Sequence, residues 1–177
     1  MSTRSRIGII REKPEGKAPV VESIYCHFDG YPEGVGKTLL ESWTTEEKVN
    51  ELMRLGDLSV LGSELGEDQG TDWFDKRHAE LYGEDVYPNP GNDPRLNWCV
   101  AYGRDRGEDG CASRIHMLDD WPDYGQEAEY IFDPADSTWR VSSPAQNPVG
   151  WNTVAPWEGF VSIPEAIELE QAATSQA

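Results

Sequence analysis

The chain has 177 residues, of which 33 are acidic and 15 are basic, so its formal net charge is −18. This charge argues against broad binding to a nucleic-acid backbone, which requires Lys and Arg, and against binding to an anionic membrane surface. Aromatic residues make up 10% of the chain, more than a disordered acidic segment carries. We therefore expect one folded domain over residues 1–170, with a frayed tail at 171–177.

The negative charge is concentrated after the first third of the chain. Residues 1–60 carry a net charge of −2, whereas residues 61–177 carry −16. Residues 63–94 are acidic and rich in Gly, Asn and Pro, which indicates a loop-rich insertion with a short helix over 73–82. The odd number of cysteines, the lack of a signal-peptide pattern and the lack of a long apolar run predict free thiols, no membrane span and a cytoplasmic location.

Strand patterns occur near both ends of the chain. Residues 6–11 and 20–28 are rich in Ile, Val, Tyr and Phe, and we expect them to pair as an antiparallel hairpin. Residues 96–102 predict another strand. A second hairpin is expected over 129–132 and 137–142, which flank an Asp-Pro turn.

Two consecutive helices are predicted between these strand regions. The first covers residues 36–43, and the second covers about 45–55, with Thr44 as its N-cap and Glu47 completing a capping box. A shorter helix is expected to begin at Pro164. The order of elements predicts an α+β fold: a small, mostly antiparallel sheet with two consecutive helices packed on one face.

The sequence Gly36-Lys37-Thr38 follows a strand and begins a helix, as the end of a Walker A loop would. The motif requires a glycine five residues before Gly36, where this chain has Tyr31, and Pro32 removes one backbone N–H from the loop. We therefore expect an ordinary helix start here rather than a site of nucleotide hydrolysis.

His27 and Asp29 lie on one side of a predicted strand end, where they could act as an acid–base pair or bind a metal ion. No further His or Cys has metal-ligand spacing, so we favour a structural His and predict neither a metal site nor a cofactor. The charged segment 104–110 is either a ligand-contacting loop or a solvated hairpin tip. The alternative ligand-binding site that follows from these segments consists of His27, Asp29, Tyr31, Lys37, Arg104 and Arg106.

Acidic residues also lie beside large aromatic residues in the second half of the chain. Such a combination suits a protein–protein contact, in which Trp and Tyr anchor the partner and carboxylates steer it. An ordinary soluble surface explains the pattern equally well. The candidate partner-binding residues are Asp72, Trp73, Asp75, Asp119, Asp120, Trp121, Asp123 and Tyr124.

Several segments resemble a family of small uncharacterised proteins encoded by bacteriophages, prophages and actinobacteria. The resemblance covers roughly residues 2–142 and includes TRSRIGII, SIYCHFDGYPEGVGKTLLESW, TTEEKVNELMRLGDLSVLG and CVAYGRDRGED. The chain has Phe28 where Trp is commoner in that family. The resemblance implies a phage context and expression in a bacterial cytoplasm, but it assigns no catalytic residue.

The sequence therefore leaves two classes of function open, with a virion component as a third possibility. The leading prediction is a non-enzymatic phage accessory protein that modulates or inhibits a host or defence protein with a basic surface, with acidic mimicry of nucleic acid as one route. The alternative is a small-molecule or nucleotide-binding protein, or an enzyme, with its site around His27, Asp29 and Lys37. The oligomeric state is not predicted.

Overall fold

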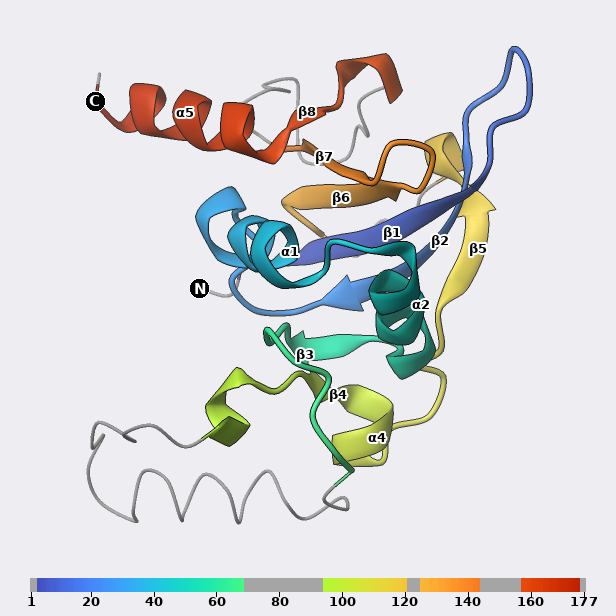
Figure 1. Cartoon of the computed structure of the whole chain (residues 1–177), viewed down its shortest axis with the longest axis vertical. Coiled ribbons are helices and arrows are strands. Elements are labelled where there is room, and N and C mark those ends of the chain that lie inside the picture. The colour runs from blue at the N-terminus through green and yellow to red at the C-terminus, as the bar shows by residue number, and fades with distance from the viewer. Residues whose placement is uncertain (1–2, 69–93, 121–124, 144–156, 176–177) are drawn as a thin grey trace.

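In the part of the chain that the structure describes, eight strands form one mixed sheet at the centre of the molecule (Figure 1). The computed structural model describes residues 3–68, 94–120, 125–143 and 157–175. Neighbouring strands follow the order β4-β3-β2-β1-β6-β7-β8, and β5 pairs with β2 outside this path. The strands are β1 (Ser5–Glu12), β2 (Val20–Cys26), β3 (Leu58–Val60), β4 (Val100–Ala101), β5 (Arg114–Met117), β6 (Ala128–Asp133), β7 (Thr138–Ser142) and β8 (Val161–Ser162).

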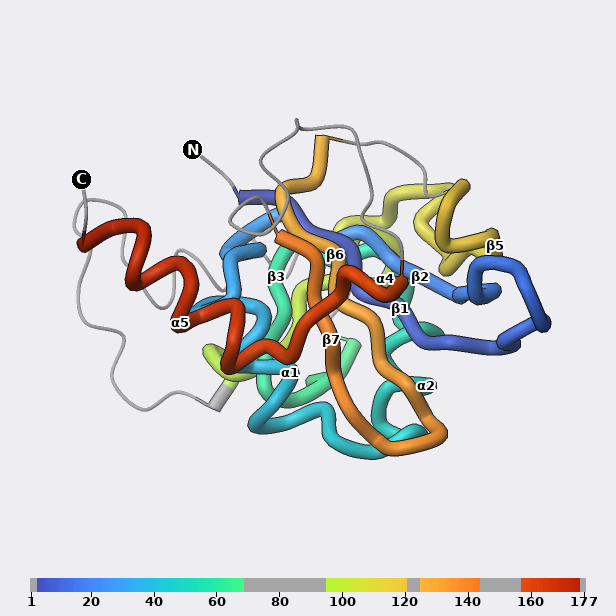
Figure 2. Tube along the Cα trace, turned by 90° about the horizontal axis from the view of Figure 1, so that it is seen from above, coloured from blue at the N-terminus to red at the C-terminus, as the bar shows by residue number. Residues whose placement is uncertain are grey.

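Four α-helices accompany the sheet in the described parts of the chain: α1 (Lys37–Ser42), α2 (Glu46–Leu55), α4 (Tyr102–Arg106) and α5 (Ile163–Thr174). A π-helical turn, η1 (Pro32–Gly36), leads directly into α1. Three short 3₁₀ turns are η2 (Pro94–Asn97), η3 (Leu118–Asp120) and η4 (Trp157–Gly159). α1 and α2 lie on the same side of the sheet, and α5 projects from its edge (Figures 1 and 2).

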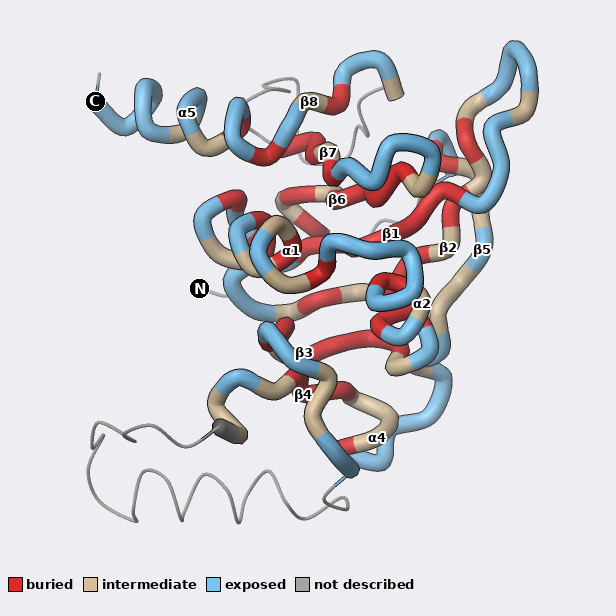
Figure 3. The backbone as a smooth tube through the Cα atoms, viewed as in Figure 1, coloured by how far each residue is buried: buried red, intermediate tan, exposed pale blue. Residues whose placement is uncertain are grey.

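β1 and β2 pair in antiparallel register with Ile7 opposite Ile24, which confirms the predicted first hairpin. β6 and β7 pair in the same way, which confirms the second. β1 also pairs in parallel with β6, and β2 pairs in parallel with β3. β1 therefore has a partner on both edges, and its first six residues are all buried (Figure 3).

The face covered by α1 and α2 holds the larger apolar core. Two buried tryptophans join the helical layer to later parts of the chain. Nε1 of Trp43, the residue after α1, donates to the carbonyl of Gly62 at 2.9 Å, and Nε1 of Trp139 in β7 donates to the carbonyl of Trp43 at 2.7 Å. Burial of a side chain of this size stabilises the fold by on the order of 3 kcal/mol, and here it leaves no indole N–H unsatisfied.

The opposite face of the sheet carries a smaller apolar cluster, which includes Ile10 and Val21, and a chain of polar groups that runs from a buried residue to a half-buried one. Nη2 of Arg6, a fully buried residue of β1, donates to Oγ of Ser23 at 2.8 Å. Oγ of Ser23 lies 2.8 Å from Nε2 of His116, and Nδ1 of His116 lies 2.8 Å from the carbonyl of Met117. Since a carbonyl only accepts, Nδ1 carries the proton, and the neutral ring accepts the Ser23 hydroxyl proton at Nε2.

The α+β class is confirmed, but the prediction of a small, mostly antiparallel sheet with two consecutive helices is wrong. The sheet has eight strands and is mixed, and α4 and α5 add helices far from the first pair. The physical reason is that β1 is buried, so the backbone N–H and C=O groups along both of its edges need hydrogen-bond partners. The hairpin pattern in the sequence predicts only β2 as a partner of β1. The partner on the other edge is β6, which comes from a distant part of the chain.

Four local predictions also need correction. The N-cap of α2 is Thr45, whose hydroxyl oxygen accepts from the backbone N–H of Lys48 at 3.4 Å, rather than Thr44. Of the predicted strand over 96–102, only the two residues of β4 are strand, while its first two residues belong to η2 and its last begins α4. The segment 104–110 is no hairpin tip, because its first residues belong to α4. α5 continues through Gln171 to Thr174, beyond the start of the expected frayed tail.

We expect the polar chain at His116 to make stability depend on pH. Burial lowers the pKa of His116, as do Arg6 and Arg114, against the opposing effects of the Met117 carbonyl and Asp120. Because the unfolded chain binds the proton more readily, stability falls as the pH drops through the ordinary His range, between about pH 7 and pH 5.

The measurement is urea unfolding of the wild type and of His116→Gln, which keeps an acceptor for Ser23, at both ends of this range. His116→Gln loses less stability on acidification than the wild type. Burial also lowers the pKa of His27, so His27→Gln serves as a second, independent member of the series. Identical pH dependence in the wild type and His116→Gln would contradict the proposed hydrogen-bond chain.

Candidate functional site

The turn after β2 is held in place by the central strands. The backbone N–H of Gly30 donates to the carbonyl of Thr3 at 2.8 Å, and the hydroxyl of Tyr130 in β6 donates to the carbonyl of Gly30 at 2.8 Å. Asp29 has a φ of 58°, which is uncommon for a residue other than glycine, and its carbonyl accepts from the N–H of Val35 at 2.7 Å. The turn is therefore fixed from both sides.

A hollow that we name the turn pocket lies at this turn and has a volume of about 180 Å³. Phe28 and Tyr31 line the turn pocket and are 43% and 44% exposed, which is unusual for aromatic side chains. Its lining residues are Phe28, Asp29, Tyr31, Glu33, Gly34, Val35, Thr38, Val60 and Leu61.

A second hollow, the helix groove, adjoins the turn pocket and has a volume of about 390 Å³. Tyr31 and Glu33 line both hollows, so the two form one continuous surface between η1 and α5. α5 reaches beyond the sheet here (Figure 1). The residues that line the helix groove are Tyr31, Glu33, Glu170, Gln171, Thr174 and Ser175.

The electrostatics of the helix groove are dominated by two carboxylates. Burial raises the pKa of Glu170, and the charge of Glu33 raises it further. Nε2 of Gln171 donates to Oε1 of Glu33 at 2.6 Å. Within the described ranges, neither these two carboxylates nor Asp29 forms an ion pair, and α5 contains no Lys or Arg. The surface thus holds negative charge that the described chain does not neutralise.

The two hollows contain only Asp29 and Tyr31 of the six residues predicted as a ligand site. His27 lies outside them: its Nδ1 is 2.8 Å from the hydroxyl of Tyr25, and its ring meets Phe28 edge-on at 4.5 Å. Burial, Arg4 and Arg106 lower the pKa of His27, so His27 and Arg106 interact electrostatically away from the hollows.

The remaining predicted cations have structural contacts. Arg104 donates to Asp105, which is fully buried and whose Oδ2 accepts from the N–H of Ala101 at 2.7 Å. Arg104 also donates to the carbonyls of Leu65 and Cys99 at 2.9 and 2.8 Å. Arg106 lies over the ring of Tyr102, and Lys37 pairs with Glu41 at 3.9 Å.

Of the predicted partner-binding residues, the structure places two. Asp119 and Asp120 are exposed in η3. The other six lie outside the described residues: Asp72, Trp73, Asp75, Trp121, Asp123 and Tyr124.

Among the charged and aromatic residues that line the two hollows, sequence reasoning missed three: Phe28, Glu33 and Glu170. Glu33 is adjacent in the sequence to residues that were singled out, but Glu170 lies 137 positions further along the chain, and only the tertiary fold brings α5 to η1. The one available signal is the composition of α5, which contains Glu165, Glu168 and Glu170 and no basic residue.

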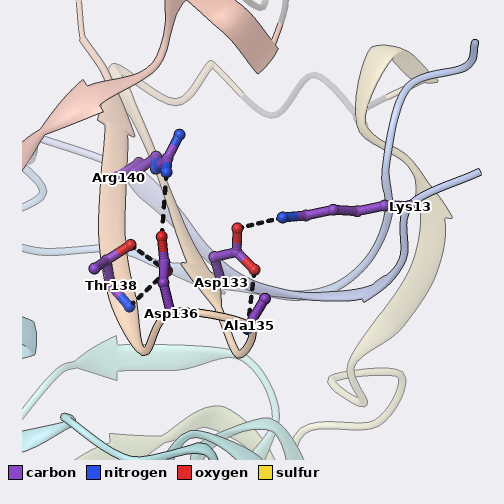
Figure 4. Close-up of polar contacts among 6 residues, drawn as sticks. All are labelled: Lys13, Asp133, Ala135, Asp136, Thr138 and Arg140. Atoms are coloured by element: carbon purple, nitrogen blue, oxygen red, sulfur yellow. Dashed lines mark hydrogen bonds and ion pairs between the residues drawn. The ribbon is translucent and has the colours of Figure 1, made fainter.

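The hairpin between β6 and β7 provides a contrast, because its acidic residues are satisfied internally (Figure 4). Asp133 pairs with Lys13 and accepts from the N–H of Ala135. Asp136 accepts from the hydroxyl of Thr138 and pairs with Arg140 at 3.3 Å. These carboxylates stabilise the turn, whereas Asp29, Glu33 and Glu170 have no cationic partner among the described residues, and Glu33 accepts only from Gln171.

The described residues give little support for a nucleophilic cysteine or a metal-binding site. Burial raises the pKa of Cys26 and of Cys99 to about 12, so both remain protonated thiols rather than nucleophilic thiolates at neutral pH. No three His, Cys, Asp or Glu side chains in the described ranges cluster as metal ligands. No helix among the same residues has the length and apolar character needed to cross a bilayer.

Comparisons with protein-family models, with curated proteins and with solved structures found no match to this chain.

We expect Gly34→Ala to destabilise the turn that forms the pocket. A Cβ at this position would lie 2.3 Å from the carbonyl oxygen of Asp29, which is itself held by Val35. The predicted loss is more than about 2 kcal/mol of unfolding free energy, measured by urea denaturation. Gly103→Ala in α4 is the control: its nearest neighbour would be 3.7 Å away, so we expect no loss. A Gly34→Ala protein as stable as the wild type would contradict this packing.

We also expect Glu170→Gln to stabilise the protein at neutral pH. The pKa of Glu170 is raised in the folded state, so its carboxylate opposes folding above that pKa, and the effect disappears as the pH falls through it. Relief of one like-charge pair predicts a gain of up to about 0.5 kcal/mol in thermal or urea unfolding. Glu168→Gln on the same helix, outside the groove, is the control. A loss of stability in Glu170→Gln would show that a cation already neutralises Glu170.

Proposed function

We propose that this chain is a non-enzymatic binding protein that docks a partner with a basic surface onto the turn pocket and the helix groove. One observation carries the proposal: Glu33 and Glu170 lie in one groove, and no basic side chain of the described residues pairs with them. A cation supplied by a partner removes their mutual repulsion on binding. A negative site of this kind favours positively charged ligands over anionic ones.

The aromatic side chains beside the groove support the same proposal. Tyr31 lines both hollows and is 44% exposed, and Phe28 lines the turn pocket. Exposed aromatic rings supply contact area at protein interfaces and attract Lys and Arg through their faces. The net charge of −18 adds long-range steering toward a basic partner, an effect that salt screens.

The phage resemblance of the sequence extends the proposal to the identity of the partner. We propose a host or defence protein, whose activity the chain modulates or inhibits, in a bacterial cytoplasm. Many basic surfaces in such proteins bind nucleic acid, so occupation of a nucleic-acid site by this acidic surface is one route to inhibition.

The test compares two double variants with the same net charge as baits in a lysate of the bacterial host. Glu33→Lys with Glu170→Lys reverses the groove, whereas Glu51→Lys with Glu168→Lys reverses two exposed carboxylates on α2 and α5 that line neither hollow. We expect the wild type and the second variant to retain one stoichiometric basic protein, identified by mass spectrometry, and the groove variant to lose it.

Two results would overturn the proposal. Either no stoichiometric partner is recovered at low and moderate salt, or both double variants lose the partner to the same extent. Equal loss would mean that total charge, rather than the groove, governs binding. Circular dichroism and thermal unfolding of both variants establish that the comparison is made between folded proteins.

A further inference from the structure

We propose that the turn pocket receives one arginine side chain of the partner. The inference rests on the proposed function and names the residue that the surface recognises. It follows from the chemistry of the pocket walls, which present hydrogen-bond acceptors, aromatic rings and an apolar floor together.

Four hydrogen-bond donors of the pocket lining are already used within the protein. The N–H of Gly34 donates to the carbonyl of Tyr31 at 2.9 Å, and the hydroxyl of Thr38 donates to the carbonyl of Gly34 at 3.2 Å. The N–H groups of Phe28 and Val35 donate to the carbonyls of Ser59 and Asp29. The carboxylates of Asp29 and Glu33 and the lone pairs of the Thr38 hydroxyl remain as acceptors, so the pocket suits a ligand rich in donors.

Arginine matches both the acceptors and the rest of the lining. Its guanidinium carries five N–H donors in a plane, pairs with carboxylates and stacks on aromatic faces such as those of Phe28 and Tyr31. Its methylene stem fits the apolar part of the lining, formed by Val35, Val60 and Leu61. Lysine carries a compact, strongly hydrated ammonium that gains less from the rings.

The backbone conformation of Asp29 supports a role for its carboxylate in ligand binding. Its positive φ of 58° is a region that glycine enters without cost and other residues enter with strain. A glycine at this position would form the same turn with less strain. The aspartate adds an acidic side chain to the pocket lining.

The test uses three capped tripeptides, acetyl-Gly-X-Gly-amide with X as arginine, lysine or citrulline, titrated into the ¹⁵N-labelled full chain. We expect the arginine peptide to shift the amide signals of Gly34, Val35 and Thr38 and to bind at least about five-fold more tightly than the lysine peptide. Citrulline has the same shape as arginine without its charge, and we expect it to bind at least about ten-fold more weakly than arginine.

Asp29→Asn is the matched variant, because Asn also tolerates a positive φ, and Glu168→Gln is its control. We expect Asp29→Asn to weaken arginine binding by about five- to ten-fold and Glu168→Gln to leave it unchanged. Equal affinities for arginine and lysine, an unchanged affinity of Asp29→Asn, or no saturable shift at the pocket amides up to about 20 mM peptide would each overturn the inference.

These outcomes are separable from those of the proposed function. If the groove variant loses a captured partner while the peptides show no preference for arginine, the partner docks on the surface without using the pocket in this way. If arginine binds selectively at the pocket but no partner is captured, the pocket inference holds and the proposed protein-binding function is wrong.

Discussion

Burial of β1 on both faces and pairing on both edges is the constraint on which the other elements depend. On one face, Ile7 and Ile9 pack in the core beneath α1 and α2. On the other face, Ile10 belongs to a second apolar cluster, and the fully buried Arg6 begins the hydrogen-bond chain through Ser23 to His116. β2 and β6 occupy its two edges, one antiparallel and one parallel. A strand in this position needs a partner for the backbone groups of each edge and side chains that can be buried on each face.

The same strands position the candidate site. Gly30 is held by Thr3, immediately before β1, and by Tyr130 of β6, so the turn that forms the pocket is fixed to the centre of the sheet. The contact between Gln171 and Glu33 then joins α5 to this turn. The result is a rigid frame that presents carboxylates and aromatic rings to solvent, and such pre-organisation lowers the cost of binding.

Local information in the sequence was enough to predict both hairpins, the helix that ends at Gly56 and the helix that starts near Pro164. It failed at 96–102, where η2 precedes β4 and α4 follows it; the buried carboxylate of Asp105 accepts from the N–H of Ala101 at this junction, a contact that a strand pattern does not predict. The candidate site was predicted only at Asp29 and Tyr31. Glu170 reaches the turn from a distant part of the chain, whereas His27 and Lys37, which are close in sequence, lie outside the hollows.

The place of α5 in the chain has a consequence for when the surface exists. One wall of the helix groove comes from η1, near the start of the chain, and the other comes from α5, the last helix described. During translation the first wall leaves the ribosome long before the second. The nascent protein therefore has no complete groove until α5 has emerged and packed, so the proposed docking surface requires the chain through α5.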